Sequence, residues 1–296
     1  MRSLLFVPGD SPKKLAKAFD CGADALILDL EDSVAPAVKA QAREVTAAFL
    51  DEYRPKAERP RLYVRVNALD TGLTDDDLDA VIPHTPDGIF LPKSTCGADV
   101  MLIDAKITTA EALGGIDDGA TRIVAIATET GGSLFEMGSY AGCSARLEAL
   151  TWGAEDLSAD VGALDNRNAD GGYTDLYRIA RSLCLAAAAG AGVMAMDSVF
   201  TDFRDEDGLR ADCRDAVRDG FVSKMAIHPA QVGPINEIFT PSDEAIGEAE
   251  AVMRALRDAG DAGVASLAGR MIDRPHQRRA ERLLARAKAA GKPVSI

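Results

Sequence analysis

The sequence is poor in cysteine, histidine and aromatic residues, and it has no long apolar run. Its five cysteines are scattered without any C-x-x-C spacing, so we expect reduced thiols and no disulfide framework. The three histidines, His84, His228 and His276, are far apart, which disfavours a zinc site. The apolar start at 4–7 is too short for a signal peptide, and no run reaches the roughly 18 apolar residues of a membrane helix. These absences predict a soluble, cytoplasmic protein that does not contact a membrane.

Positive charge is also scarce. The chain has 33 Lys and Arg against 47 Asp and Glu, which gives a formal net charge of -14. Nucleic-acid binding needs a basic surface, and no recognition motif is present, so we expect no nucleic-acid partner and favour a small-molecule enzyme. The exception is the basic segment 266–296, in which eight basic residues accompany two acidic ones, for a net charge of +6. This segment is either a solvated helix surface or a contact for an acidic neighbour or an anionic ligand.

The hydrophobic pattern predicts a repeated strand–helix unit. Short apolar runs alternate with Ala-rich, charged stretches of helical spacing as far as about residue 235. Eight βα units in about 230 residues match a closed (β/α)8 TIM barrel better than an open doubly wound sheet. We therefore predict an α/β fold with a (β/α)8 barrel catalytic domain over residues 1–235. The expected strands are 4–8, 25–30, 61–67, 88–92, 122–128, 147–153, 193–198 and 223–228.

Capping residues mark the ends of the expected helices, and a helical extension follows the barrel. Ser11 is placed to begin a helix, the acids at 75–77 suit a first turn, and Gly22, Gly192 and Gly220 suit helix ends. Beyond residue 235 the strand signals stop, and residues 242–258 and 275–290 predict two helices. We expect residues 236–296 to form a helical C-terminal extension. Because its connection, 261–269, carries small residues and glycines, the last helix could serve as a lid or as an arm exchanged with a neighbouring subunit.

Polar residues stand at the ends of the predicted strands. In a barrel of this type the active site forms at the C-terminal ends of the strands, so these residues are the candidates for the site. They are Asp29, Glu31 and Asp32 at the end of the second strand, Arg65 and Asn67 on the third, Lys93 after the fourth, Glu129 after the fifth, Glu155 and Asp156 after the sixth, and His228 at the end of the eighth.

Two of these acids, Glu129 and Asp156, suit a metal ion. They come from adjacent strands, and each follows an apolar run that would anchor it. Mg²⁺ prefers one or two protein carboxylates, with water and substrate oxygens completing an octahedron. We therefore predict that Glu129 and Asp156 bind Mg²⁺. The alternative is that they only cap the helices that follow.

Other residues at the same face suit an anionic substrate. The Arg65 guanidinium would bind a carboxylate or a developing enolate oxygen, although a salt bridge to Asp29 or Glu31 is the alternative, and both could hold together. Lys93 is a further cation expected to contact the substrate. The segment Gly153-Ala154-Glu155-Asp156 presents successive backbone N–H groups, which can bind a carboxylate without a basic side chain.

Ordered motifs along nearly the whole chain carry a family likeness. They are RSLLFVPGDSPKKLAKA, LILDLEDSVAP, LYVRVNA, LPKS, ATETGGSLFE, WGAEDLSADVG, KMAIHPAQ and GRMIDRP. In this order they resemble the citrate lyase β-subunit-like and malyl-CoA lyase-like members of the HpcH/HpaI aldolase superfamily. The resemblance implies a Mg²⁺-dependent carbon–carbon lyase acting on 3-hydroxyacyl thioesters such as citryl-, malyl- or citramalyl-CoA. It also implies a (β/α)8 barrel that assembles into homotrimers or hexamers.

The same resemblance implies roles for individual residues. Glu129 of the ET motif and Asp156 of the ED motif would hold the metal, and Arg65 of the RVN motif would contact the substrate. Asp273 of the MID-P motif would transfer the proton, reaching over from a neighbouring subunit. One departure is the sequence Thr-Gly-Gly-Ser after Glu129, where many relatives have Thr followed by Pro or Ala; it leaves the choice of 2-oxo acid open.

Alternative functions remain open from the sequence. They are a class II aldolase acting on free 4-hydroxy-2-oxo acids, a malyl-CoA thioesterase, and a β-subunit that works only within a citrate lyase complex carrying an acyl-carrier partner. Arg2 and the basic segment 266–296 are candidates for binding the phosphates of a CoA thioester. For Arg2 the alternative is an ion pair at the bottom of the barrel.

Overall fold

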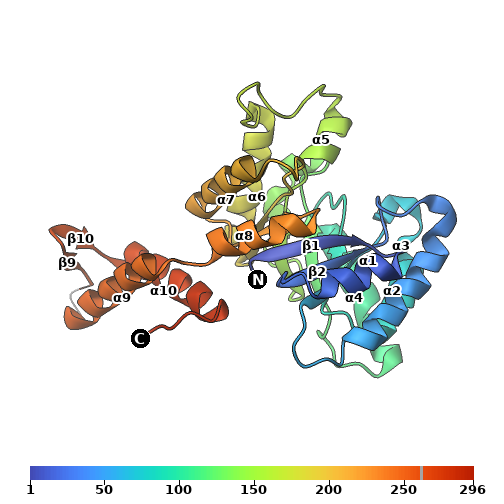
Figure 1. The fold of residues 1–296 in the computed structure, drawn as a ribbon, viewed down its shortest axis with the longest axis horizontal. Coiled ribbons are helices and arrows are strands. Elements are labelled where there is room, and N and C mark those ends of the chain that lie inside the picture. Colours follow the sequence, from blue (N-terminus) through green and yellow to red (C-terminus); the bar gives the residue numbers. More distant parts are fainter. Residues whose placement is uncertain (261–262) are drawn as a thin grey trace. The chain divides into compact units, whose positions relative to one another are not determined.

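The computed structural model describes residues 1–260 and 263–296, and these form two compact units. One unit is Arg2–Ile235, and the other is Met1 together with Asn236–Ile296. Figure 1 shows both units, with the helices and several of the strands labelled.

The larger unit is built on a closed barrel of eight parallel strands (Figure 1). The barrel closes because β1 pairs with both β2 and β8, in a register that sets Leu5 beside Leu26 and Ala226. The predicted TIM barrel is therefore confirmed, and every strand bound lies within two residues of its predicted position. The strands are β1 (Ser3–Pro8), β2 (Ala25–Asp29), β3 (Arg61–Arg65), β4 (Gly88–Leu91), β5 (Arg122–Ile126), β6 (Leu147–Thr151), β7 (Met194–Asp197) and β8 (Ser223–Ala226).

Helices cover the outside of this barrel, so its strands are shielded on both faces. Every residue of β2, β4 and β8 is buried. This explains why β2 and β4 are short, mainly apolar runs in the sequence. The helices are α1 (Pro12–Phe19), α2 (Lys39–Tyr53), α3 (Thr74–Val81), α4 (Gly97–Gly114), α5 (Ala154–Val161), α6 (Asp175–Ala191), α7 (Glu206–Asp219) and α8 (Val232–Phe239). Short 3₁₀ turns fill several connections: η1 (Pro36–Val38), η2 (Leu69–Thr71), η3 (Ile82–His84), η4 (Gly132–Phe135), η5 (Met137–Tyr140) and η6 (Pro229–Gln231).

The capping signals mark helix ends with two differences in detail. The C-cap of α1 is Asp20, and Gly22, expected there, lies two residues beyond it. Gly192 and Gly220 end α6 and α7 with φ of 71° and 118°, the left-handed conformation that glycine adopts without a steric penalty. The acids at 75–77 lie in the first turn of α3. Ser11 precedes α1 as expected, but its side chain accepts no capping hydrogen bond. Pro12 at the first helical position needs no N–H acceptor and starts the helix.

A buried ion cluster ties β7 and β8 to the helices outside the barrel. Asp197 accepts hydrogen bonds from Lys224 Nζ (2.8 Å), Trp152 Nε1 (2.8 Å) and Arg181 Nε (3.3 Å). Lys224 Nζ also donates to Asp212 of α7 at 2.6 Å, and both Asp197 and Lys224 are 1% exposed. Burial opposes ionisation of both groups, yet Lys224 and Arg181 hold the pKa of Asp197 below its usual value. The acids likewise raise the pKa of Lys224, so the cluster stays ionised.

We predict that Asp197→Ala destabilises the protein by about 3–5 kcal/mol, because it leaves the buried Lys224 charge short of a partner. Urea unfolding measures this change. The control is Asp215→Ala, which removes an ion pair with Arg218 on the exposed face of α7 and should cost under about 1 kcal/mol. Equal losses in the two variants would contradict the prediction.

The smaller unit pairs two helices, α9 (Asp243–Asp258) and α10 (Arg274–Ala289). Ile246 and Ala249 of α9 pack against Ala280, Leu284 and Ala287 of α10. Ser242 caps α9 by accepting a hydrogen bond from the Ala245 N–H at 3.2 Å. The two predicted helices are therefore present, with bounds one residue from those expected.

The expectation that strands stop beyond residue 235 was wrong. β9 (Ala265–Leu267) and β10 (Arg270–Ile272) form an antiparallel hairpin between the helices. Its turn residues Ala268 and Gly269 have φ of 48° and 74°, the signs of a type I′ turn, which fits the twist of a two-residue hairpin. Strands of three residues are too short to show alternation, so the hydrophobic pattern did not predict them. Residues 261 and 262 of the expected connection 261–269 lie outside the described residues.

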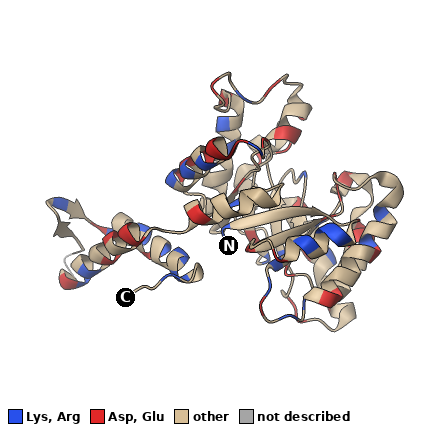
Figure 2. Cartoon of the chain, viewed as in Figure 1, with Lys and Arg blue, Asp and Glu red and all other residues tan. Residues whose placement is uncertain are grey.

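Part of the basic segment is used within this unit. Arg286 Nη2 donates to the Phe239 carbonyl at 3.0 Å, and Lys292 Nζ lies 2.8 Å from Asp243. Figure 2 shows the mixture of acidic and basic residues on these helices. The contacts favour a structural role for these two cations. Among the described residues, no helix combines the length and apolar character that crossing a membrane would require.

Candidate active site

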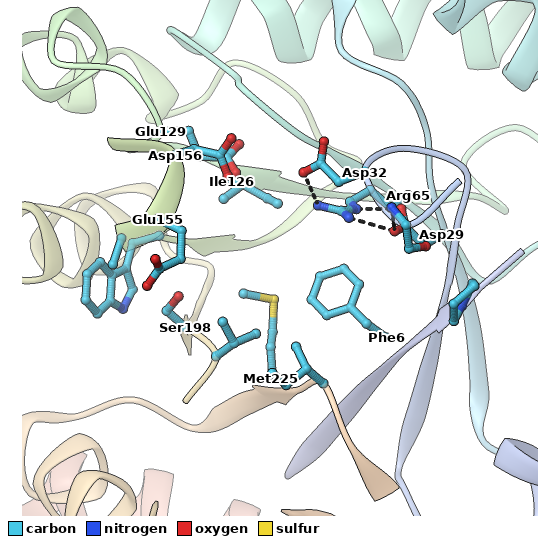
Figure 3. A pocket seen from close by; sticks show the side chains of 17 residues that line it. Phe6, Asp29, Asp32, Arg65, Ile126, Glu129, Glu155, Asp156, Ser198 and Met225 are labelled. Atoms are coloured by element: carbon cyan, nitrogen blue, oxygen red, sulfur yellow. Dashed lines mark hydrogen bonds and ion pairs between the residues drawn. The ribbon is translucent and has the colours of Figure 1, made fainter. Parts of the chain in front are cut away.

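The C-terminal ends of the barrel strands enclose a cavity of about 410 Å³. Residues in or just after the C-terminal halves of β1, β2, β3, β5, β6, β7 and β8 line it, as the TIM barrel predicts. Figure 3 shows two polar groups in this cavity, Glu129 together with Asp156, and Arg65 together with Asp29 and Asp32. Apolar side chains complete the lining, among them Phe6, Ile126, Trp152 and Met225.

Arg65 is held in place by the acids at the C-terminal end of β2 and in the loop after it. Its Nε and Nη2 each lie 2.7 Å from an Asp29 carboxylate oxygen, and its Nη1 lies 2.8 Å from Glu31 and 3.6 Å from Asp32. Burial favours the neutral acid, but the hydrogen bonds and charge of Arg65 lower the pKa of Asp29. The salt-bridge alternative is therefore realised. Because Arg65 also lines the cavity, the salt bridge orients the guanidinium toward it.

Glu129 and Asp156 lie side by side at the opposite part of the cavity (Figure 3). Glu129 follows β5 and is 4% exposed, whereas Asp156 lies in the first turn of α5. Burial, and then the nearby charge of Asp156, raise the pKa of Glu129 well above its usual value. The arrangement is thus two carboxylates that repel each other in a partly dry site, which a bound cation would relieve.

The backbone around Glu129 is fitted to its carboxylate. The Lys93 N–H donates to Glu129 Oε2. Gly153 approaches so closely that a Cβ there would lie 2.7 Å from Glu129 Cγ. The Gly153 N–H itself donates to Thr128 Oγ1 at 3.3 Å. Glu129 therefore has its position set from two sides.

This donor set fits Mg²⁺. The ion takes one or two protein carboxylates and fills its octahedron with water and substrate oxygens, and Glu129 and Asp156 supply two carboxylates facing one cavity. Within residues 1–260 and 263–296, no cluster of three or more His, Cys, Asp or Glu side chains is arranged to bind a metal ion. The geometry thus supports the pair that the sequence singled out.

The start of α5 adds backbone donors beside these acids. Gly153 precedes the helix, and Ala154 and Glu155 begin it and line the cavity. The first N–H groups of a helix have no partner within the helix, so they can bind an anion. The Glu155 carboxylate accepts a hydrogen bond from Asn166 Nδ2 at 2.8 Å.

Several other predicted residues serve the structure. Asn67 Nδ2 donates to Asp77 at 2.7 Å and to the Leu30 carbonyl at 3.0 Å, which ties two loops together away from the cavity lining. His228 caps η6 by accepting from the Ala230 N–H at 3.2 Å. The expectation that all of these polar residues belong to the site is therefore too broad. The side chains of Asn67 and His228 form hydrogen bonds with neighbouring backbone and side-chain groups instead.

Two residues with predicted functional roles, Arg2 and Asp273, are not among the residues that line the cavity. Arg2 pairs with Asp24 at 2.7 Å at the N-terminal end of β1, so the alternative of an ion pair at the barrel bottom is the observed one. Asp273 belongs to the smaller unit, where it precedes α10 and its Oδ1 lies 2.6 Å from His276 Nδ1.

Sequence reasoning missed the contributions of β1 and β7. Phe6, inside β1, lines the cavity. The Arg65 guanidinium lies over its ring, with 4.8 Å between Arg65 Cζ and the ring centroid. Ser198 and Val199 follow β7 and also line the cavity. Only their place near the C-terminal ends of predicted strands could have indicated these residues, because these ends meet at the same face of the barrel.

Comparison with known proteins agrees with this geometry. Residues 2–229 match the HpcH/HpaI aldolase/citrate lyase family. The chain belongs to this family. Residues 174–292 also match a family described as a C–C bond lyase of the TIM-barrel fold. These matches make the chain an enzyme of the carbon–carbon lyase type.

Relatives of this family span nearly the whole chain. The L-malyl-CoA/beta-methylmalyl-CoA lyase of Rhodobacter capsulatus is 34% identical over 310 residues, covering 98% of this chain and 95% of that protein. The citrate lyase subunit beta-like protein of Mycobacterium tuberculosis is 34% identical over 289 residues, covering 96% and 94%. A crystal structure of protein CitE from M. tuberculosis, in complex with magnesium, acetoacetate and coenzyme A, is similar with a TM-score of 0.76 at 33% identity. That match covers 97% of this chain and 98% of that one.

We predict that Gly153→Ala weakens divalent-cation binding at least about tenfold, because the new Cβ would push the Glu129 carboxylate out of place. Calorimetric titration with Mn²⁺ measures the change. Gly132→Ala is the matched control, since a Cβ there meets nothing within 4 Å. Unchanged Mn²⁺ binding by a folded Gly153→Ala protein would contradict the role of Glu129 as a cation ligand held in place by this contact.

Proposed function

We propose that the chain is a Mg²⁺-dependent lyase that cleaves or forms a 3-hydroxyacyl-CoA such as malyl-, citramalyl- or citryl-CoA, with acetyl-CoA and a 2-oxo acid as the other partners. The observation that carries this proposal is that Glu129, Asp156 and the Arg65 guanidinium line one cavity. Relatives named for the lyase reaction, and a related structure holding magnesium, acetoacetate and coenzyme A, support it.

Cleavage of such a thioester places negative charge on oxygen twice. The hydroxyl loses its proton, the carbon–carbon bond breaks, and the electron pair passes to the thioester carbonyl to form an enolate. Mg²⁺ bound to Glu129 and Asp156 would supply a Lewis acid for the oxygens of the 2-oxo acid half. Arg65, oriented by Asp29, offsets the charge that develops on the enolate or alkoxide.

Other residues in and beside the cavity bind and orient the substrate. The N–H groups of Ala154 and Glu155 at the start of α5 hold the carboxylate of the 2-oxo acid. Lys93 adds positive charge next to Asp156, from which its Nζ is 3.2 Å away. Apolar neighbours such as Trp152 and Met225 limit water near the reacting carbons.

Asp273 is the proposed proton carrier, contributed by a neighbouring subunit of a homotrimer or hexamer in the cytoplasm. In the condensing direction it takes a proton from the acetyl-CoA methyl group, a weak acid whose enolate needs the positive charge of the cavity. The basic segment 266–296 is proposed to bind the CoA phosphates. Arg286 and Lys292 already have structural partners, so the other cations of the segment are the candidates.

The test is a substrate panel with and without Mg²⁺, in which malyl-, citramalyl- and citryl-CoA are compared with free 4-hydroxy-2-oxo acids. We expect acetyl-CoA and a 2-oxo acid from one of the thioesters, and a loss of on the order of 100-fold or more in Glu129→Gln and Asp156→Asn. Asp215→Asn, on the surface of α7, is the control and should keep full activity.

Each other outcome of the panel identifies a different reaction. Cleavage of the free acids alone indicates an aldolase, and release of free CoA with malate indicates a thioesterase. Turnover only after a stable complex with an acyl-carrier partner forms indicates a citrate lyase β-subunit. Full Mg²⁺-dependent activity in both carboxylate variants would refute the metal site.

We predict that Asp273→Asn abolishes turnover while thioester binding is retained, because the amide keeps the shape of the carboxylate but cannot accept the proton. Steady-state kinetics, thioester affinity, and exchange of the acetyl-CoA methyl protons into D₂O would be measured. Asp243→Asn, an exposed acid of the same unit, serves as the control. Full methyl exchange in Asp273→Asn would remove this residue from the mechanism.

A further inference from the structure

Lys93 contacts both carboxylates of the candidate metal pair, through different groups. Its backbone N–H donates to Glu129 Oε2. Its side-chain Nζ lies 3.2 Å from Asp156 Oδ1, 2.6 Å from Glu31 Oε1 and 3.9 Å from Asp32 Oδ1. One residue therefore links the loop after β2, the acid after β5 and the first turn of α5.

The backbone of Lys93 has an unusual conformation that fixes the first of these contacts. Its φ is 50°, in the left-handed region that side chains other than glycine rarely adopt. The residue directly follows Pro92 at the end of β4. Because this contact uses the main chain, replacing the side chain leaves the donor to Glu129 in place, and the ammonium can be tested separately.

The ammonium has a second, stronger partner besides Asp156. Glu31 is 5% exposed and accepts the shorter contact, and its other oxygen lies 2.8 Å from Arg65 Nη1. Since Glu31 holds the ammonium at 2.6 Å, the ammonium can give up Asp156 without losing its buried counter-charge. Asp156 is the more exposed acid of the two, at 33% for its side chain.

A divalent cation and an ammonium make conflicting demands on Asp156. Both bind its carboxylate oxygen, and a cation of charge +2 placed a few ångströms from an ammonium is repelled by it. We propose that the Lys93 ammonium competes with the divalent cation for Asp156, that Glu31 retains the ammonium when the cation binds, and that Lys93 thereby sets the cation affinity of the site. This inference rests on the proposed metal site at Glu129 and Asp156.

The test measures Mn²⁺ affinity by calorimetry in the absence of substrate. Lys93→Met removes the charge, and Lys93→Gln removes the charge but keeps an amide that can donate to Glu31. We expect both to bind Mn²⁺ on the order of tenfold more tightly than the unchanged protein. Lys93→Arg, which keeps the charge, should stay within about threefold of it.

A remote charge change separates local competition from the net charge of the protein. Lys106 pairs with Asp75 at 2.6 Å, joining α4 to α3 on the outside of the barrel. Lys106→Met therefore changes the total charge as Lys93→Met does, and we expect its Mn²⁺ affinity to match that of the unchanged protein because surface charges at a distance are screened.

The outcomes separate this inference from the proposed function. If the unchanged protein binds Mn²⁺ and the two uncharged variants bind it equally well or more weakly, competition by Lys93 is refuted and the metal site stands. If the unchanged protein binds no divalent cation, both proposals fall. Circular dichroism verifies folding of each variant, and Lys93→Gln carries the test should Lys93→Met not fold.

Discussion

Closure of the barrel is the constraint on which the site depends. Because β1 pairs with both β2 and β8, the sheet has no free edge, and the C-terminal ends of its strands meet around one cavity. Residues as far apart in the chain as Phe6, Arg65 and Met225 become neighbours by this means alone. An open sheet of the same strands would place its first and last members at opposite sides.

Within that cavity the charges are unequal and arranged in two groups. Five carboxylates line it, those of Asp29, Asp32, Glu129, Glu155 and Asp156, with one basic side chain, Arg65. Glu31 and Lys93 contact these groups from beside the lining. Asp29 is matched closely to Arg65, whereas burial, and then the nearby charge of Asp156, raise the pKa of Glu129 in the other group. Family members are known with magnesium bound, which fits a site whose surplus is negative.

Most strands were readable from the sequence because their residues are largely buried and therefore mainly apolar, as in β2 and β4. The acids after those runs, Glu129 and Asp156, were readable for the same reason. Contacts between loops were not: nothing in the order of residues shows that Lys93 takes a left-handed conformation or that Asn67 turns to Asp77. The hairpin of β9 and β10 was missed because strands of three residues carry no periodic signal.

The ion cluster around Asp197 and Lys224 limits how this part of the barrel can change over evolution. A single replacement that removes the charge of Asp197 or of Lys224 leaves the opposite charge buried without this partner. Exchange of the whole set for apolar residues of similar volume, by contrast, is a substitution that folded proteins tolerate. Descendants of this chain would therefore either keep the charged residues at these positions together or replace them together. The same holds for Trp152, because its indole N–H donates to Asp197.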